Sequence, residues 1–154
     1  MLTISDSVEI AVPAEAVWRW LCALPAHYAE WHPAHHSCEV LRGTLWEPGT
    51  VVLMEEDLHG RRHRLRCQVI GTTPGREIEY RAGPWLKGRF RVEPLNGHSR
   101  FRAELDFGSG SVARLLDRPL GWLFRRRIAS VRKHQREEGL NLKALLEDRS
   151  ANAG

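Results

Sequence analysis

A histidine and a glutamate interrupt the apolar stripe of the last long segment of the chain. Residues 118–147 carry apolar side chains at steps of three and four, which predicts an amphipathic helix. His134 and Glu138 stand within this stripe one helical turn apart, so their side chains meet on one face. An unpaired buried polar group is costly, and imidazole and carboxylate are ligands that zinc, manganese or iron accept. The pair is therefore a candidate half of a metal site; the alternative is a surface pair worth about 0.2–0.5 kcal/mol.

A hairpin centred on His59-Gly60 brings a second carboxylate to the same region. With these two residues as the turn, Glu56 lies opposite His63 on the next strand. Arginines alternate with apolar residues along that second strand and must take its outer face. The inner face then holds Glu56 and His63 together with Val52, Met54, Leu65, Cys67 and Val69.

Three histidines follow Trp31 in the stretch His32-Pro33-Ala34-His35-His36. Pro33 disfavours helix in the residue before it, so residues 32–36 are predicted to form a loop between the short helices and the sheet. One of His32, His35 and His36 can complete a set of imidazoles and carboxylates without a thiolate. The residues themselves leave open which one.

The elements that must position these groups follow from the change in periodicity along the chain. Residues 4–12 alternate as a strand; Pro13 opens one short helix, and a second runs to about Trp31. A period of two then predicts strands at 37–43, 50–58, 61–71, 76–82, 87–94 and 99–107. Short turns between them indicate an antiparallel meander of α+β class, whose concave face the last helix covers, leaving a cavity. Residues 1–148 are expected as one domain, 108–111 as a flexible joint and 149–154 as a flexible tail.

Composition and charge narrow the classes of partner. The net charge of +4 comes with arginine clusters at 61–66 and 125–127, which indicate a solvated face, and no nucleic-acid motif accompanies them. Three dispersed cysteines indicate a reducing cytoplasm, with no signal peptide and no membrane-spanning run. The basic amphipathic run 114–127 is interpreted as a cavity lid, or less favourably as a membrane-contacting segment. Oligomeric state stays open.

Three stretches carry a resemblance to a known family: residues 28–35 (Tyr-Ala-Glu-Trp-His-Pro-Ala-His), Glu55-Glu56, and residues 134–139 (His-Gln-Arg-Glu-Glu-Gly). With the order of elements over residues 3–147, they resemble the START/polyketide cyclase (SRPBCC) superfamily of helix-grip fold. The branch they look most like contains diacetylphloroglucinol hydrolase, a considerably longer chain whose substrate pocket is not carried over.

The resemblance implies a zinc site, or one for another divalent metal, built from His35, Glu56, His134 and Glu138, with His36 as the alternative to His35. It implies metal-assisted hydrolysis or cyclisation next to a carbonyl of a small aromatic or polyketide-like molecule. In such a reaction His63 or Tyr28 is the candidate to move protons. A non-catalytic protein that binds or transports a lipid or other hydrophobic ligand is the alternative. The residues expected to line the ligand cavity are Trp31, Met54, Leu65, Tyr80, Phe90 and Phe101.

Overall fold

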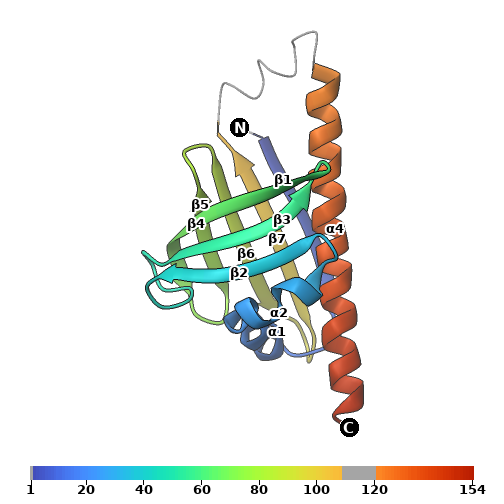
Figure 1. Cartoon of the computed structure of the whole chain (residues 1–154). Coiled ribbons are helices and arrows are strands. Elements are labelled where there is room, and N and C mark those ends of the chain that lie inside the picture. The colour runs from blue at the N-terminus through green and yellow to red at the C-terminus, as the bar shows by residue number, and fades with distance from the viewer. Residues whose placement is uncertain (1, 109–120) are drawn as a thin grey trace.

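The computed structural model describes residues 2–108 and 121–154. One antiparallel sheet holds all seven strands in the order β1-β7-β6-β5-β4-β3-β2. The strands are β1 (Leu2–Ile10), β2 (His35–Arg42), β3 (Val51–Leu58), β4 (Arg61–Thr73), β5 (Glu77–Ala82), β6 (Leu86–Pro94) and β7 (Ser99–Phe107). The helices are α1 (Ala14–Cys22), α2 (Leu24–Trp31) and α4 (Gly121–Asn152). The long helix α4 runs along the open side of the curved sheet, and α1 and α2 close one end (Figure 1). This is the helix-grip arrangement that the sequence predicts.

The strand register confirms the hairpin derived from the His59-Gly60 turn. Glu56 pairs with His63, and the pairs to either side follow the predicted alternation of faces. His59 and Gly60 both adopt positive φ, at 55° and 73°, as a two-residue turn matching the twist of the strands requires. Glu56 is consequently buried, whereas the arginines of β4 are exposed.

Most predicted strand ends lie within two residues of the observed ones, and two differences bear on the site or on the end of the chain. Strand β2 begins at His35, inside the stretch 32–36 that was predicted to be a loop, because His35 already pairs with Glu56 of β3. Helix α4 continues to Asn152, so residues 149–152 of the expected tail are helical, and Arg149 bonds Glu30 of α2 at 2.6 Å. The expected joint at 109–111 and the basic residues 114–120 lie outside the described residues. No described helix has the length and hydropathy needed to cross a membrane.

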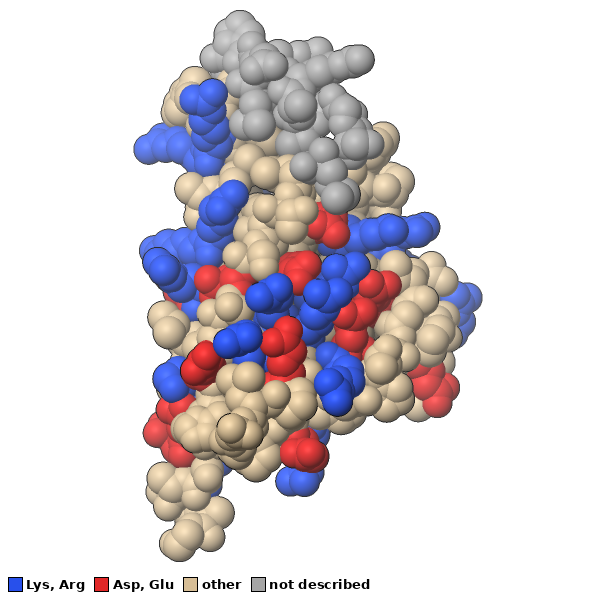
Figure 2. All heavy atoms as spheres, turned by 180° about the vertical axis from the view of Figure 1, so that it is seen from behind, with Lys and Arg blue, Asp and Glu red and all other residues tan. Residues whose placement is uncertain are grey.

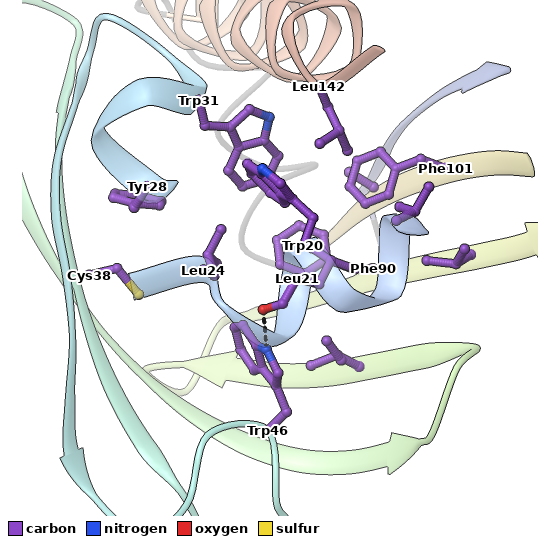
Figure 3. Close-up of a cluster of buried hydrophobic side chains, with 14 of the residues drawn as sticks. Trp20, Leu21, Leu24, Tyr28, Trp31, Cys38, Trp46, Phe90, Phe101 and Leu142 are labelled. Atoms are coloured by element: carbon purple, nitrogen blue, oxygen red, sulfur yellow. Dashed lines mark hydrogen bonds between the residues drawn. The ribbon is translucent and has the colours of Figure 1, made fainter. Parts of the chain in front are cut away.

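An aromatic core fills the end of the molecule that α1 and α2 close (Figure 3). The indole of Trp31 meets Trp20, Phe90 and Phe101 edge-on, with ring centroids 5.2, 6.0 and 6.3 Å away, a favoured geometry for aromatic pairs. Trp46 donates a hydrogen bond to the Leu21 carbonyl at 2.6 Å and so ties the β2–β3 connection to α1. These contacts fix α2, and with it Tyr28 and Trp31, against the sheet.

The outer face of the sheet carries paired charges. Arg89 bonds Glu79 at 2.7 Å, and Arg100 bonds Glu9 at 3.1 Å, each across neighbouring strands. On the face seen from behind, basic and acidic side chains are interspersed across the middle of the molecule (Figure 2). Charge on these strands is therefore largely balanced, and the apolar side chains that alternate with it face the helix.

Candidate metal centre

Two histidines and two glutamates converge between the sheet and α4. His35 starts β2, Glu56 lies on β3, and His134 and Glu138 face them from α4; one ligand atom of each lies within 4.8 Å of all the others. His35 Nε2 is 3.1 Å from His134 Nε2 and 2.9 Å from Glu138 Oε1. Glu56 Oε2 is 3.6 Å from His35 Nε2 and 3.5 Å from His134 Nε2. The i,i+4 pair of the sequence thus faces inward rather than lying on the surface.

These separations fit a single small cation. A tetrahedral zinc ion with bonds of about 2.0–2.2 Å holds its ligand atoms about 3.3–3.6 Å apart. The five measured separations among the four groups run from 2.9 to 3.6 Å, the last being 3.2 Å between His134 Nε2 and Glu138 Oε1. The side chains are 0–12% exposed, so the set is shielded from solvent. Nitrogen and carboxylate oxygen without thiolate suit zinc, manganese or iron.

The orientation of His35 is fixed by Tyr28. The Nδ1 atom of His35 lies 3.1 Å from the Tyr28 carbonyl oxygen, which can only accept, so Nδ1 donates. Nε2 is therefore the atom directed at the other three groups, and in a neutral His35, the form that binds a metal, it carries the lone pair. The Tyr28 ring stacks on that imidazole at 4.0 Å, and its hydroxyl donates to Glu56 Oε2 at 3.1 Å. Such outer contacts are the usual means of orienting metal ligands.

Helix α4 is held close to the sheet at the level of these ligands. A Cβ atom on Gly139 would lie 3.4 Å from both Val8 and Asp6 of β1, so only a very small residue allows this approach. Trp31 Nε1 donates to the Glu138 carbonyl at 2.9 Å, and Asn141 Nδ2 donates to the Trp31 carbonyl at 3.0 Å. The turn that carries Glu138 is therefore fastened to both β1 and α2.

Protons balance the buried charge when no cation is bound. Burial lowers the pKa of His134, but hydrogen bonds and the charges of Glu138 and Glu56 outweigh it and raise the pKa to about 10. Burial raises the pKa of Glu138, yet hydrogen bonds from His134 and His35 reduce it to about 2. At neutral pH the cluster therefore holds an imidazolium between carboxylates, and a metal ion would take the place of its proton.

The other two histidines of the 32–36 stretch point elsewhere. His36 faces the outer side of β2, where its Nε2 lies 2.7 Å from Asp57 Oδ2. His32 accepts a hydrogen bond from the Ala34 amide at Nδ1 and therefore donates from Nε2 to Glu137, at 2.7 Å. Its ring lies against that of His134, with centroids 4.3 Å apart. Both nitrogen atoms of His32 are thus engaged, and His35 is the residue that meets the helix pair.

His63 stands apart from the cluster although it pairs with Glu56 along the strands. Its Nε2 donates to the Leu58 carbonyl at 3.2 Å, and its ring meets that of His59 edge-on. It is half-buried and does not line the cavity described below, as far as the described residues define that cavity.

An apolar cavity of about 230 Å³ opens beside the four groups and is lined by Glu56, His134 and Glu138 among others. Five of the six expected cavity residues line it, namely Trp31, Met54, Leu65, Tyr80 and Phe90. Phe101 instead lies behind Phe90, with ring centroids 5.8 Å apart, in the aromatic core. Gln135 also lines the cavity; its place one turn after Val131 and beside His134 was a signal available in the sequence.

Comparison with known proteins gives a family match and solved structures of the same fold. Residues 1–147 match the model of the family described as polyketide cyclase / dehydrase and lipid transport. No curated protein matches the sequence. The structure resembles the Zhui aromatase/cyclase from Streptomyces sp. R1128, with a TM-score of 0.80 and 21% identity, covering 99% of this chain and 98% of that one.

Two further solved structures share the fold. One is a polyketide cyclase-like protein from Corynebacterium glutamicum (TM-score 0.63, 21% identity, 94% of this chain and 91% of that one). The other is a START superfamily protein from Mycobacterium smegmatis (TM-score 0.59, 16% identity, 88% and 97%). At these identities the likeness concerns the fold, and the site must be judged from its own residues.

Proposed function

Because the chain belongs to the polyketide cyclase / dehydrase and lipid transport family, we propose that it is a metal-dependent enzyme acting next to a carbonyl group of a small aromatic or polyketide-like molecule. The metal is zinc or a similar divalent ion, held by His35, Glu56, His134 and Glu138. The observation that carries the proposal is the convergence of these four groups, within 4.8 Å of one another, on the wall of an otherwise apolar cavity. Structural stability alone gives no reason to bury two carboxylates and two imidazoles together.

A bound divalent ion in this position supplies Lewis acidity toward a carbonyl oxygen and lowers the pKa of water toward about 7. The protein residues supply the rest. The apolar walls bring an aromatic ring up to the cluster and exclude bulk water, which strengthens every electrostatic interaction there. Trp31 and Phe90 provide flat surfaces beside the site.

Hydrolysis next to an aryl carbonyl is the reaction that best uses this arrangement. The oxygen of water ends on the acyl carbon, the bond from that carbon to the ring breaks, and the ring carbon gains a hydrogen. A proton-bearing group is therefore needed beside the ring. Tyr28 lines the cavity, and its hydroxyl touches Glu56, so it is better placed for proton transfer than His63, whose Nε2 is engaged by Leu58.

Metal analysis of the purified protein tests the proposal. After expression in metal-replete medium, the wild type is expected to carry about one equivalent of zinc, manganese or iron, and His134→Ala less than about a tenth of that. His36→Ala is the matched control, because it removes the same side chain from the residue next to His35 on the opposite face of β2. Less than a tenth of an equivalent in the wild type, or full metal content in His134→Ala, overturns the site.

Turnover is tested separately on a panel of phenols and naphthols that carry an acyl group on a ring carbon. Mass spectrometry is expected to show the deacylated ring after incubation with the metal-loaded protein, and none after chelation. Tyr28→Phe, assayed at a metal concentration that saturates its weakened site, should still slow product formation.

A carrier that binds a hydrophobic molecule without chemistry is the second candidate. It is favoured by the predominantly apolar lining and by the modest size of the cavity, about 230 Å³. Ligand binding with unchanged affinity after metal removal, together with no product from any member of the panel, would favour the carrier.

A further inference from the structure

Tyr80 lies flat across a neighbouring strand in the wall of the cavity. It is paired with Gly88 in the register of β5 and β6. A Cβ atom on Gly88 would lie 2.0 Å from Tyr80 Cζ and 2.3 Å from its hydroxyl oxygen. Cβ atoms never approach other atoms so closely, so the missing side chain of Gly88 is what gives the phenol ring its place. The pair shapes this wall as a flat aromatic surface ending in a hydroxyl group.

The Tyr80 hydroxyl is not hydrogen-bonded to any residue that the structure describes, unlike the hydroxyl of Tyr28, the other tyrosine in the cavity. Tyr28 donates to Glu56, whereas Tyr80 has no hydrogen-bond partner among the residues that the structure describes, although the residue is only 8% exposed and lines the cavity. The fully buried polar side-chain atoms without a partner, among the described residues, belong to Trp20, Ser99, Arg102 and Gln135, so the Tyr80 oxygen is instead open to the cavity. Tyrosine hydroxyls in such largely buried sites usually have a hydrogen-bond partner. A ligand that occupies the cavity can provide it.

The hydroxyl group of Tyr80 keeps its proton. Burial raises the pKa of Tyr80 well above its ordinary value, and the charges of Cys67, Glu138 and Glu56 raise it further. At neutral pH Tyr80 is therefore an uncharged donor that suits a ring-bound or carbonyl oxygen. It stands on β5, two strands from Glu56 on β3, which is about 10 Å across the sheet.

We infer that Tyr80 is a second polar anchor of the ligand site, and that the ligand is a flat system of one or two rings with an oxygen substituent at the end remote from its reacting carbonyl. The size agrees, since a cavity of about 150 Å³ holds one benzene molecule and this cavity measures about 230 Å³. The direction in which the ligand lies, with its carbonyl toward the four metal-binding candidates, rests on the proposed function. The hydrogen bond between the ligand and Tyr80 is independent of the proposed function.

A matched pair of fluorescent probes tests the anchor on protein dialysed against a chelator. The probes are 6-hydroxy-2-acetylnaphthalene and 2-acetylnaphthalene, which differ only in the oxygen remote from the acetyl group. The wild type is expected to bind the hydroxylated probe about three- to ten-fold more tightly, as one net hydrogen bond allows. Tyr80→Phe should abolish this preference while keeping the affinity for 2-acetylnaphthalene within about two-fold. Gly88→Ala should weaken both probes, because its Cβ displaces the ring.

Three outcomes overturn the inference: binding of neither probe by the wild type, equal affinity for both, or an unchanged preference in Tyr80→Phe. Because the titration uses metal-free protein, its result is separable from that of the metal analysis. A protein that prefers the hydroxylated probe but binds no metal keeps the anchor and loses the proposed enzyme. A protein that binds metal but shows no preference for the hydroxylated probe keeps the proposed metal site and loses the Tyr80 anchor.

Discussion

Binding of zinc near neutral pH should release about one proton from the protein. In the metal-free protein, hydrogen bonds to Glu138 and Glu56 raise the pKa of His134 to about 10, so its imidazole is charged at pH 7. The Nε2 atom that bonds both carboxylates is also the atom that would bind the metal. The proton on it must therefore leave when the ion arrives.

The cost of removing this proton sets the pH dependence of the affinity. From pH 7 to a pKa of about 10 is about three units, or about 4 kcal/mol at 1.36 kcal/mol per unit. The apparent affinity at pH 7 should then be about 1,000-fold below its alkaline limit, and its logarithm should rise by about one per pH unit. Between pH 6 and pH 8 this is an increase of about 100-fold.

Calorimetric titration of the chelated protein with zinc, in buffers of different ionisation enthalpy, measures both quantities. The number of protons released follows from the dependence of the heat on the buffer. Release of fewer than about 0.3 protons at pH 7, with an affinity that does not change between pH 6 and pH 8, would refute the charge balance described for His134. Glu55→Gln is a suitable control, since Glu55 is the outward-facing neighbour of Glu56 and bonds Arg64 at 3.1 Å.

Three further predictions concern the residues around the cluster. Tyr28→Phe removes the donor to Glu56 and should weaken zinc about 10- to 100-fold by calorimetry; an unchanged affinity would show that the hydroxyl does not orient the ligand. Gly139→Ala should leave the free energy of unfolding in urea unchanged or raise it by up to about 1 kcal/mol, because helix propensity improves. Gly139→Leu should instead push α4 away from β1 and lose metal. Equal stability and equal metal content in the two variants would contradict this. In the metal-free protein, the raised pKa of His134 stabilises the fold fully below about pH 6.5, and this stabilisation is lost as the pH rises through 10. The lowered pKa of Glu138 stabilises the fold fully above about pH 4.5, and this stabilisation is lost as the pH falls through 2. Urea unfolding should therefore show greatest stability near pH 5–6, with an alkaline decline that His134→Gln abolishes; a wild-type curve flat up to pH 10 would be inconsistent with it.

The fold was predictable because its signals are local. Period-two segments separated by turn residues indicate an antiparallel meander, and an apolar stripe of period 3.6 indicates the covering helix. The turn at His59-Gly60 fixed which residues of β3 and β4 face inward, and the observed pairing of Glu56 with His63 follows it. The face of the strand on which a residue lies does not, however, determine where its side chain points. His63 lies on the inner face, yet its ring turns toward Leu58 and His59.

The choice among the three histidines after Trp31 depends on an irregularity of the sheet. Strict alternation with Cys38, which faces inward opposite Met54, would turn His36 inward and His35 outward. A register shift between His35 and Ser37 inserts one extra residue, so that His35 and Cys38 both face inward and His36 faces Asp57. A bulge of this kind changes the direction in which side chains point, and no residue type in this stretch predicts it.

By itself, the sequence determined the order of elements, the inward face of β3 and the presence of a histidine and a glutamate on the covered face of the last helix. These depend on periodicity and turn chemistry, which act over a few residues. Only the tertiary structure decided that His35 meets them, that Tyr28 orients both His35 and Glu56, and that Tyr80 lies over Gly88. Each of these depends on the distance between elements remote in sequence, and that distance is set by how closely α2, α4 and the sheet pack together.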